Sequence, residues 1–278
     1  MLQVYEREGV TCVEMRNSLV GKVYAFIIDG MLVDTGPSNL EEDLAPFYEN
    51  ASFDRVVLTH HHEDHTGMAP WIMENRRVPI YIHPLGIGRC SQDSPYPAYR
   101  KKTWGLRNAF SALPLNETIR SKTKQWEVIH TPGHADDHIA LFDSETGTLF
   151  SGDLFVSRRT KVIITSESVP QIMTSIRNIL TYDVGSMFCC HAGYVSDGKA
   201  KLTQKLEYLE DLFAEVEKLY RRGMSPNEID QKLFPKEYPI SPISEGEWDS
   251  IHIVTSIVKE FKVESEHHSL HSSKWDKY

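Results

Sequence analysis

Residues 59–65, Thr-His-His-His-Glu-Asp-His, are the most informative segment of this sequence. They end a compact apolar run, residues 54–59, that predicts a strand. On a loop at the end of a strand, His60 and His62 can point the same way while His61 turns aside. Imidazole and carboxylate groups are good ligands for zinc and related first-row ions. The stretch therefore predicts a metal site at the carboxyl end of a strand.

The same placement recurs at three more strand ends. His134 follows a strand predicted at residues 126–130, Asp153 follows one at 148–150, and His191 ends one at 186–190. A lone histidine or aspartate in such a position is usually structural, and a histidine-rich loop can simply be solvated. Because four strand ends are each followed by a potential metal ligand, the pattern favours a metal site over coincidence.

These residues resemble the metallo-β-lactamase superfamily. The family's H-x-H-x-D-H signature is matched by His60, His62, Asp64 and His65. Its later Gly-His, Gly-Asp and final-histidine elements are matched by His134, Asp153 and His191. The early run Val33-Asp34-Thr35-Gly36 also resembles a family motif near the metal site, and the resemblance covers roughly residues 10–195.

The resemblance implies an α/β fold, a four-layer αβ/βα sandwich in which two sheets pack face to face with helices outside. We expect a catalytic domain over residues 1–200, a C-terminal helical extension over 201–264, and a flexible polar tail over 265–278. The extension has three candidate roles: capping the active site, contacting substrate, or forming a homodimer.

The resemblance also implies a ligand set for two metal ions, with zinc as the first choice and iron or manganese also compatible with these ligands. The first ion would take His60, His62 and His134. The second would take Asp64, His65 and His191. Asp153 would bridge them, with a hydroxide between the ions as in known relatives. Two residues receive catalytic roles: Asp64 would orient that hydroxide, and Tyr194 would donate a hydrogen bond to a developing oxyanion.

The activity that this site predicts is hydrolysis of an ester, thioester or lactone, as in the glyoxalase-like and lactonase-like branches of the family. A phosphodiesterase or nuclease is the nearest alternative. An iron-dependent persulfide dioxygenase on the same scaffold is the other, and the identity of the metal distinguishes it. The expected partner is a small-molecule substrate.

Composition and charge limit the partners and the location that we expect for this protein. A net charge of −9 and a pI near 5.8 argue against nucleic acid as a partner, because that affinity depends on cationic side chains. No stretch approaches the ~20 apolar residues that cross a bilayer, and no basic start precedes an apolar run. We therefore expect a soluble, cytoplasmic protein that binds neither membrane nor nucleic acid. Four scattered cysteines give no disulfide framework.

The remaining pattern predicts alternating strands and helices. Residues 9–14, 23–28 and 31–33 read as a β-meander, with Asp29-Gly30 as a tight turn. Residues 84–120 carry several prolines and aromatic residues without periodicity, which is typical of an active-site cover. Helices are expected at 202–222, after a cap at Ser225, and at 248–261.

Overall fold

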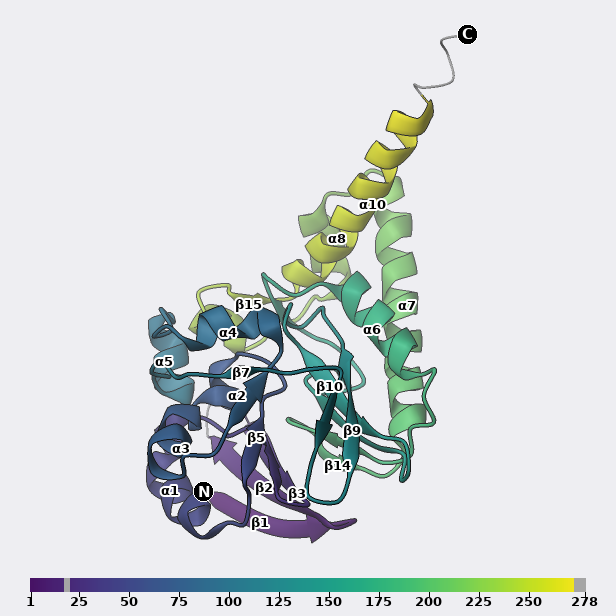
Figure 1. Cartoon of the computed structure of the whole chain (residues 1–278). Coiled ribbons are helices and arrows are strands. Elements are labelled where there is room, and N and C mark those ends of the chain that lie inside the picture. The colour runs from purple at the N-terminus through teal and green to yellow at the C-terminus, as the bar shows by residue number, and fades with distance from the viewer. Residues whose placement is uncertain (18–20, 273–278) are drawn as a thin grey trace.

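The computed structural model describes residues 1–17 and 21–272, with side chains described at 1–16 and 21–261. Its two large sheets lie face to face, with helices on both outer faces (Figure 1). This is the four-layer arrangement that the sequence predicts.

The first sheet begins as an antiparallel meander and continues with parallel strands. Within the described residues it has seven strands, in the order β1 (Leu2–Arg7), β2 (Val10–Asn17), β3 (Gly21–Ile28), β4 (Met31–Val33), β5 (Arg55–Val57), β6 (Ile80–Ile82) and β7 (Leu113–Pro114). The predicted meander is confirmed. Asp29 and Gly30, with φ of 48° and 78°, make the β3–β4 turn in the left-handed region that such a hairpin requires.

The second sheet is antiparallel except where β11 and β13 run parallel. Its order in the described part of the chain is β14 (Gly193–Val195), β13 (Met187–Cys189), β11 (Thr148–Gly152), β10 (Ile139–Asp143), β9 (Gln125–His130) and β8 (Thr118–Arg120). A small third sheet pairs β12 (Ile163–Ile164) with β15 (Trp248–Asp249).

Helices cover both outer faces. The helices on the side of the first sheet come after a short 3₁₀ turn, η1 (Ser38–Leu40). They are α1 (Glu41–Asn50), α2 (Glu63–Thr66), α3 (Ala69–Asn75), α4 (Pro84–Cys90) and α5 (Ala98–Trp104). The helices later in the chain are α6 (Val169–Ile179), α7 (Gly198–Arg221), α8 (Pro226–Leu233), α9 (Ile240–Ile243) and α10 (Ile251–Ser272). Figure 1 shows α7 running along the second-sheet side, with α10 projecting beyond the body. In the part of the chain that the structure describes, no helix combines the length and the apolar character needed to cross a bilayer.

The inner faces of the two sheets share one apolar layer. Phe26 of β3 is fully buried there, with its ring centroid 5.5 Å from that of Phe150 on β11 and 5.5 Å from that of Phe188 on β13. Trp126 of β9 packs 5.3 Å from Phe150. Aromatic rings bury a large apolar area each, so this layer supplies much of the free energy that holds the sheets together.

Three segments differ from their sequence-based expectations. The C-terminal helix begins at Ile251 rather than 248, because Trp248 and Asp249 pair with β12 as a strand. The same helix continues to Ser272, into the stretch from 265 that the sequence predicts as a flexible tail; residues 273–278 lie outside the described residues. Residues 84–120, whose sequence shows no periodicity, contain α4, α5, β7 and β8.

Replacing Phe26 with alanine should lower the free energy of unfolding by about 3–5 kcal/mol, because the missing ring leaves a cavity between the sheets. Urea denaturation measures the change. Val4→Ala on β1, where the side chain is 43% exposed, is the control and should cost well under about 1 kcal/mol. Equal stabilities for the two variants would contradict the shared core described above.

Candidate metal centre

The seven side chains predicted as ligands come from the carboxyl ends of strands in both sheets. The loop after β5 carries His60 and His62, and the short helix α2 that follows carries Asp64 and His65. The β9–β10 loop carries His134, and Asp153 and His191 follow β11 and β13. Two backbone hydrogen bonds fasten the sheets together beside this edge. Ile139 N–H donates to the Thr59 carbonyl at 2.8 Å, and Tyr24 N–H donates to the Cys190 carbonyl at 2.7 Å. The edge is therefore a fixed junction between the sheets.

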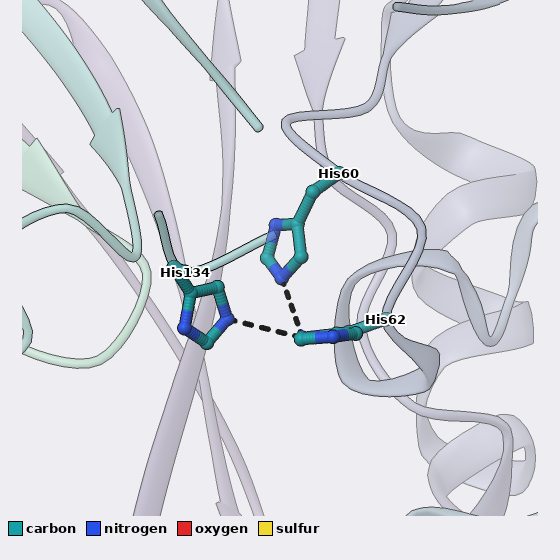
Figure 2. A group of neighbouring side chains, drawn as sticks. All are labelled: His60, His62 and His134. Carbon is teal, nitrogen blue, oxygen red and sulfur yellow. Dashed lines mark hydrogen bonds between the residues drawn. The ribbon is translucent and has the colours of Figure 1, made fainter. Parts of the chain in front are cut away.

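Three imidazoles form the first half of the cluster. Nδ1 of His62 lies 3.0 Å from Nε2 of His60 and 3.0 Å from Nε2 of His134. Figure 2 shows the three rings directed at one another, His60 and His62 from one loop and His134 from the other sheet. All three residues are buried. Three buried nitrogens that face one point are the geometry of a metal-binding triad.

The second half lies beside the first and is richer in carboxylates. Oδ2 of Asp64 lies 3.6 Å from Nε2 of His65 and 3.5 Å from Nε2 of His191. Oδ2 of Asp153 lies 3.5 Å from His65, 3.0 Å from His191 and 3.4 Å from Nε2 of His134. Asp153 therefore contacts imidazoles of both halves. The structure brings all seven predicted ligands together.

Hydrogen bonds on the outer side of the rings fix which nitrogen faces the cluster. Nδ1 of His65 bonds to Asp34 at 2.9 Å, Nδ1 of His134 bonds to Glu167 at 3.0 Å, and Nδ1 of His191 bonds to the Lys22 carbonyl at 2.9 Å. These partners are acceptors, so in each neutral ring Nδ1 carries the proton and the Nε2 lone pair points inward. Such carboxylate and carbonyl partners are what orient metal-binding histidines.

Asp34 is the hub of this outer set. Its carboxylate accepts from the Thr59 backbone N–H at 2.7 Å, the Thr59 hydroxyl at 2.8 Å and the Cys190 thiol at 3.0 Å, in addition to His65. Asp34 is fully buried and has φ of 57°, in the left-handed region that few residues other than glycine adopt. Its position is thus determined by the contacts around it.

The sequence profile of the metallo-beta-lactamase superfamily matches residues 20–191, more than half of this chain. The chain belongs to this superfamily. The "probable metallo-hydrolase YqjP" of Bacillus subtilis (strain 168) is 23% identical over 265 residues, which cover 79% of this chain and 82% of that protein.

A solved structure of a metallo-beta-lactamase family protein from Thermus thermophilus superposes with a TM-score of 0.67 at 19% identity, over 93% of this chain and 95% of that one. That likeness shows the shared fold. The atrochrysone carboxyl ACP thioesterase of Passalora fulva is 26% identical over 188 residues, which cover 64% of this chain and 49% of that protein. This chain thus spans about half of that thioesterase.

The superfamily is metal-dependent, and the electrostatics of this cluster suit cations. Burial and neighbouring imidazoles lower the pKa of His60 and His62 well below the usual value, so both rings keep free lone pairs. At His191 burial acts in the same direction, but Asp153 and Asp64 outweigh it and raise the pKa to about 9. Protons are drawn to the carboxylate-rich half, and metal binding in proteins displaces protons from ligands of this kind.

Two buried side-chain atoms of the cluster also fit a bound metal ion. Among the described residues, Nε2 of His65 and Oδ1 of Asp153 have no hydrogen-bond partner. Leaving buried polar atoms unpaired costs roughly 1–3 kcal/mol each. A metal ion at this position would give both atoms a partner, so the donor set fits the ions that the superfamily binds.

His138, which the sequence places outside the ligand set as a supporting or surface group, supports the cluster. Its Nε2 accepts from the Asp153 backbone N–H at 2.9 Å, and its Nδ1 donates to the Thr131 hydroxyl at 2.8 Å. Burial lowers its pKa to about 3, so the ring is neutral and can accept that bond. The support from Glu167 has no signal in the sequence, since its link to His134 is made only in the folded chain.

Two other residues lie outside the cluster. His61, predicted to turn aside, bonds through Nδ1 to Asp137 at 2.7 Å. The Tyr194 hydroxyl, predicted to meet an oxyanion, donates instead to Glu8 on the β1–β2 turn at 2.5 Å. The contacts of Tyr194 therefore give its predicted catalytic role no support.

The predicted cover, residues 84–120, is folded and well anchored. Arg107 is fully buried and donates to the carbonyls of Arg89 at 2.9 Å and Cys90 at 3.2 Å. These bonds tie the loop before β7 to the end of α4. The segment is therefore built from helices held by a buried arginine.

Ion pairs of one arginine join this cover to the segment that carries the first predicted ligands and to the C-terminal region. Arg100 of α5 donates to Glu63 through Nη2 at 2.7 Å and to Glu247 through Nη1 at 3.0 Å. Glu63 lies between His62 and Asp64 and is only 1% exposed. The cover thus lies directly against residues 60–65, which carry four of the predicted ligands.

Asp153→Ala should remove at least one metal ion per chain, because the carboxylate shared by both halves is lost. Elemental mass spectrometry on protein purified without chelator measures the stoichiometry. His130→Ala, which removes an exposed imidazole close to His134 in sequence, is the control and should keep the full metal content. Unchanged metal content in the Asp153 variant would rule out the ligand assignment.

Glu167→Gln should weaken metal binding by about tenfold or more, since the partner that orients His134 loses its charge. Competition with a chromophoric chelator measures the dissociation constant. Glu145→Gln on an exposed turn should leave the constant unchanged. A Glu167 variant that binds as tightly as the parent would show that His134 needs no such partner.

Proposed function

We propose that this chain is a hydrolase that cleaves an ester, thioester or lactone with two zinc ions held at the junction of its sheets. The observation that carries the proposal is the position of Asp153, whose Oδ2 lies within 3.5 Å of imidazoles from both halves. A carboxylate so placed is suited to serve two cations at once. A single-ion site would leave half of these buried ligands without a function.

The proposed division of ligands follows the contacts. His60, His62 and His134 would hold the first ion, and Asp64, His65 and His191 the second, with Asp153 shared. When bound, two such ions lower the pKa of a water from about 15.7 toward 7 and stabilise charge on the oxygens of the reacting substrate. The support for two ions is that each half has its own set of converging ligand atoms.

The chain's own groups would do the positioning. The Asp64 carboxylate lies 3.6 Å from His65 and 3.5 Å from His191, and it would accept the proton of the attacking water. Asp34 and Thr59 keep His60 and His65 in the orientation that leaves their inner nitrogens free. These supports exist without substrate, so little reorganisation is needed during the reaction.

The acyl class of substrate has two supports. One is the likeness to a fungal protein named as a thioesterase, with this chain spanning about half its length. The other is the net charge of −9, which disfavours a polyanionic substrate such as nucleic acid. We therefore propose a small acyl compound as the partner of this site.

Removing the metal with a chelator should abolish hydrolysis in a panel of ester, thioester and lactone substrates, and added zinc should restore it.

Asp64→Asn should lower kcat by about a hundredfold or more, because the amide cannot accept the proton. Asp183→Asn, at a fully exposed carboxylate, is the matched control and should leave kcat unchanged.

Three results would contradict the proposal. Acyl turnover that survives metal removal would exclude a metal-dependent mechanism. Turnover confined to phosphodiesters would indicate the phosphodiesterase alternative. One iron per chain with oxygen consumption on a persulfide would indicate the dioxygenase.

A further inference from the structure

Lys205 of α7 is a buried lysine that the proposed chemistry does not use. It is 4% exposed, and its Nζ donates to the Leu154 carbonyl at 2.9 Å and to the Phe155 carbonyl at 2.7 Å. Lysine is almost never buried to this degree unless it is paired. Within the described side chains no carboxylate lies at ion-pair distance from Nζ, so two backbone carbonyls are its partners.

Those two carbonyls belong to the residues that directly follow Asp153. The turn they begin is strained: Val156 has φ of 50°, a conformation that branched side chains rarely adopt. Backbone strain of this kind costs roughly 1–3 kcal/mol and persists only where surrounding contacts hold it. Lys205 supplies two such contacts to the turn.

Asp153 is consequently held from both sides along the chain. On its amino side, its N–H donates to Nε2 of His138 at 2.9 Å. On its carboxyl side, the Leu154 and Phe155 carbonyls are held by Lys205. The second support comes from the helical segment that follows the last predicted ligand, since α7 begins after His191 and runs along the outer face of the second sheet (Figure 1).

We propose that Lys205 is a positioning residue for the metal centre, which holds the turn after Asp153 and thereby sets the carboxylate between the two halves of the cluster. This inference rests on the proposed function, because Asp153 is the shared ligand there. It gives the C-terminal helical extension a role in the site: α7 fixes a ligand that it does not itself provide.

The role does not depend on the charge of the amine. Burial lowers the pKa of Lys205 to about 8, with Cys189, Glu167 and Asp153 acting in the opposite direction. A lysine amine keeps at least two N–H donors in either protonation state. Two donors are what the two carbonyls require.

The test is metal binding by Lys205→Met, which keeps the length and apolar stem of the side chain but has no donor. Cobalt(II) is the probe, because its visible absorption reports the geometry of its ligands without any substrate. We expect a dissociation constant raised about tenfold or more for at least one ion, together with an altered cobalt spectrum. Lys201→Met, at an exposed position on the same helix, should match the parent protein in both measurements.

A purely structural lysine would lower the unfolding temperature and leave cobalt binding unchanged in the folded protein, and that result would overturn the inference. If the methionine variant does not fold, Lys205→Gln decides, since its amide keeps N–H donors but its shorter chain does not reach both carbonyls. Unchanged cobalt affinity and spectrum in folded Lys205→Gln would likewise overturn it. A parent protein that binds no cobalt would instead count against the proposed function itself.

Discussion

A largely buried cluster of imidazoles and carboxylates lies at the junction of the two sheets, and the surrounding elements hold it in place. Five imidazoles and two carboxylates converge where the carboxyl ends of strands from two sheets meet. Without a cation such a cluster leaves buried polar atoms unpaired, as Nε2 of His65 and Oδ1 of Asp153 are. The aromatic layer around Phe26 and the backbone bonds beside Thr59 keep the two sheets in the register that brings the ligands together.

Around the cluster lies a second set of polar groups, each with a defined partner. Asp34 and Glu167 orient imidazoles, and His138 holds the backbone of Asp153. Lys205 reaches the same strand end from the helical extension. Two helices therefore contact the surroundings of the site: α7 through Lys205, and α5 through the pair of Arg100 with Glu63, which lies between His62 and Asp64. Contacts from so many sides hold the side chains of the cluster in place, as the proposed function requires.

The sequence predicted those parts of the molecule that local pattern controls. The side chains of the cluster could be found because each stands at or just after the end of an apolar strand, and the turn at Asp29-Gly30 because its residue types favour positive φ. The two helices within 84–120 were not predictable, since each is short and has no apolar periodicity. The pairing of Trp248 and Asp249 with β12 joins segments about 85 residues apart, so local pattern favoured a helix there.

Supporting contacts were the least predictable part of the site. Nothing in the sequence links Glu167 to His134 or Lys205 to Asp153, because both contacts exist only once the sheets and helices have packed. Tyr194 illustrates the converse, since its closeness to His191 in sequence suggested a catalytic role, whereas the fold turns its hydroxyl to Glu8.

The most direct test of the account is anomalous diffraction at the zinc edge from crystals of the zinc-loaded protein. Two peaks are expected, one among His60, His62 and His134 and one among Asp64, His65 and His191, with the Asp153 carboxylate in contact with both. A single peak, or peaks that lie away from these side chains, would contradict it.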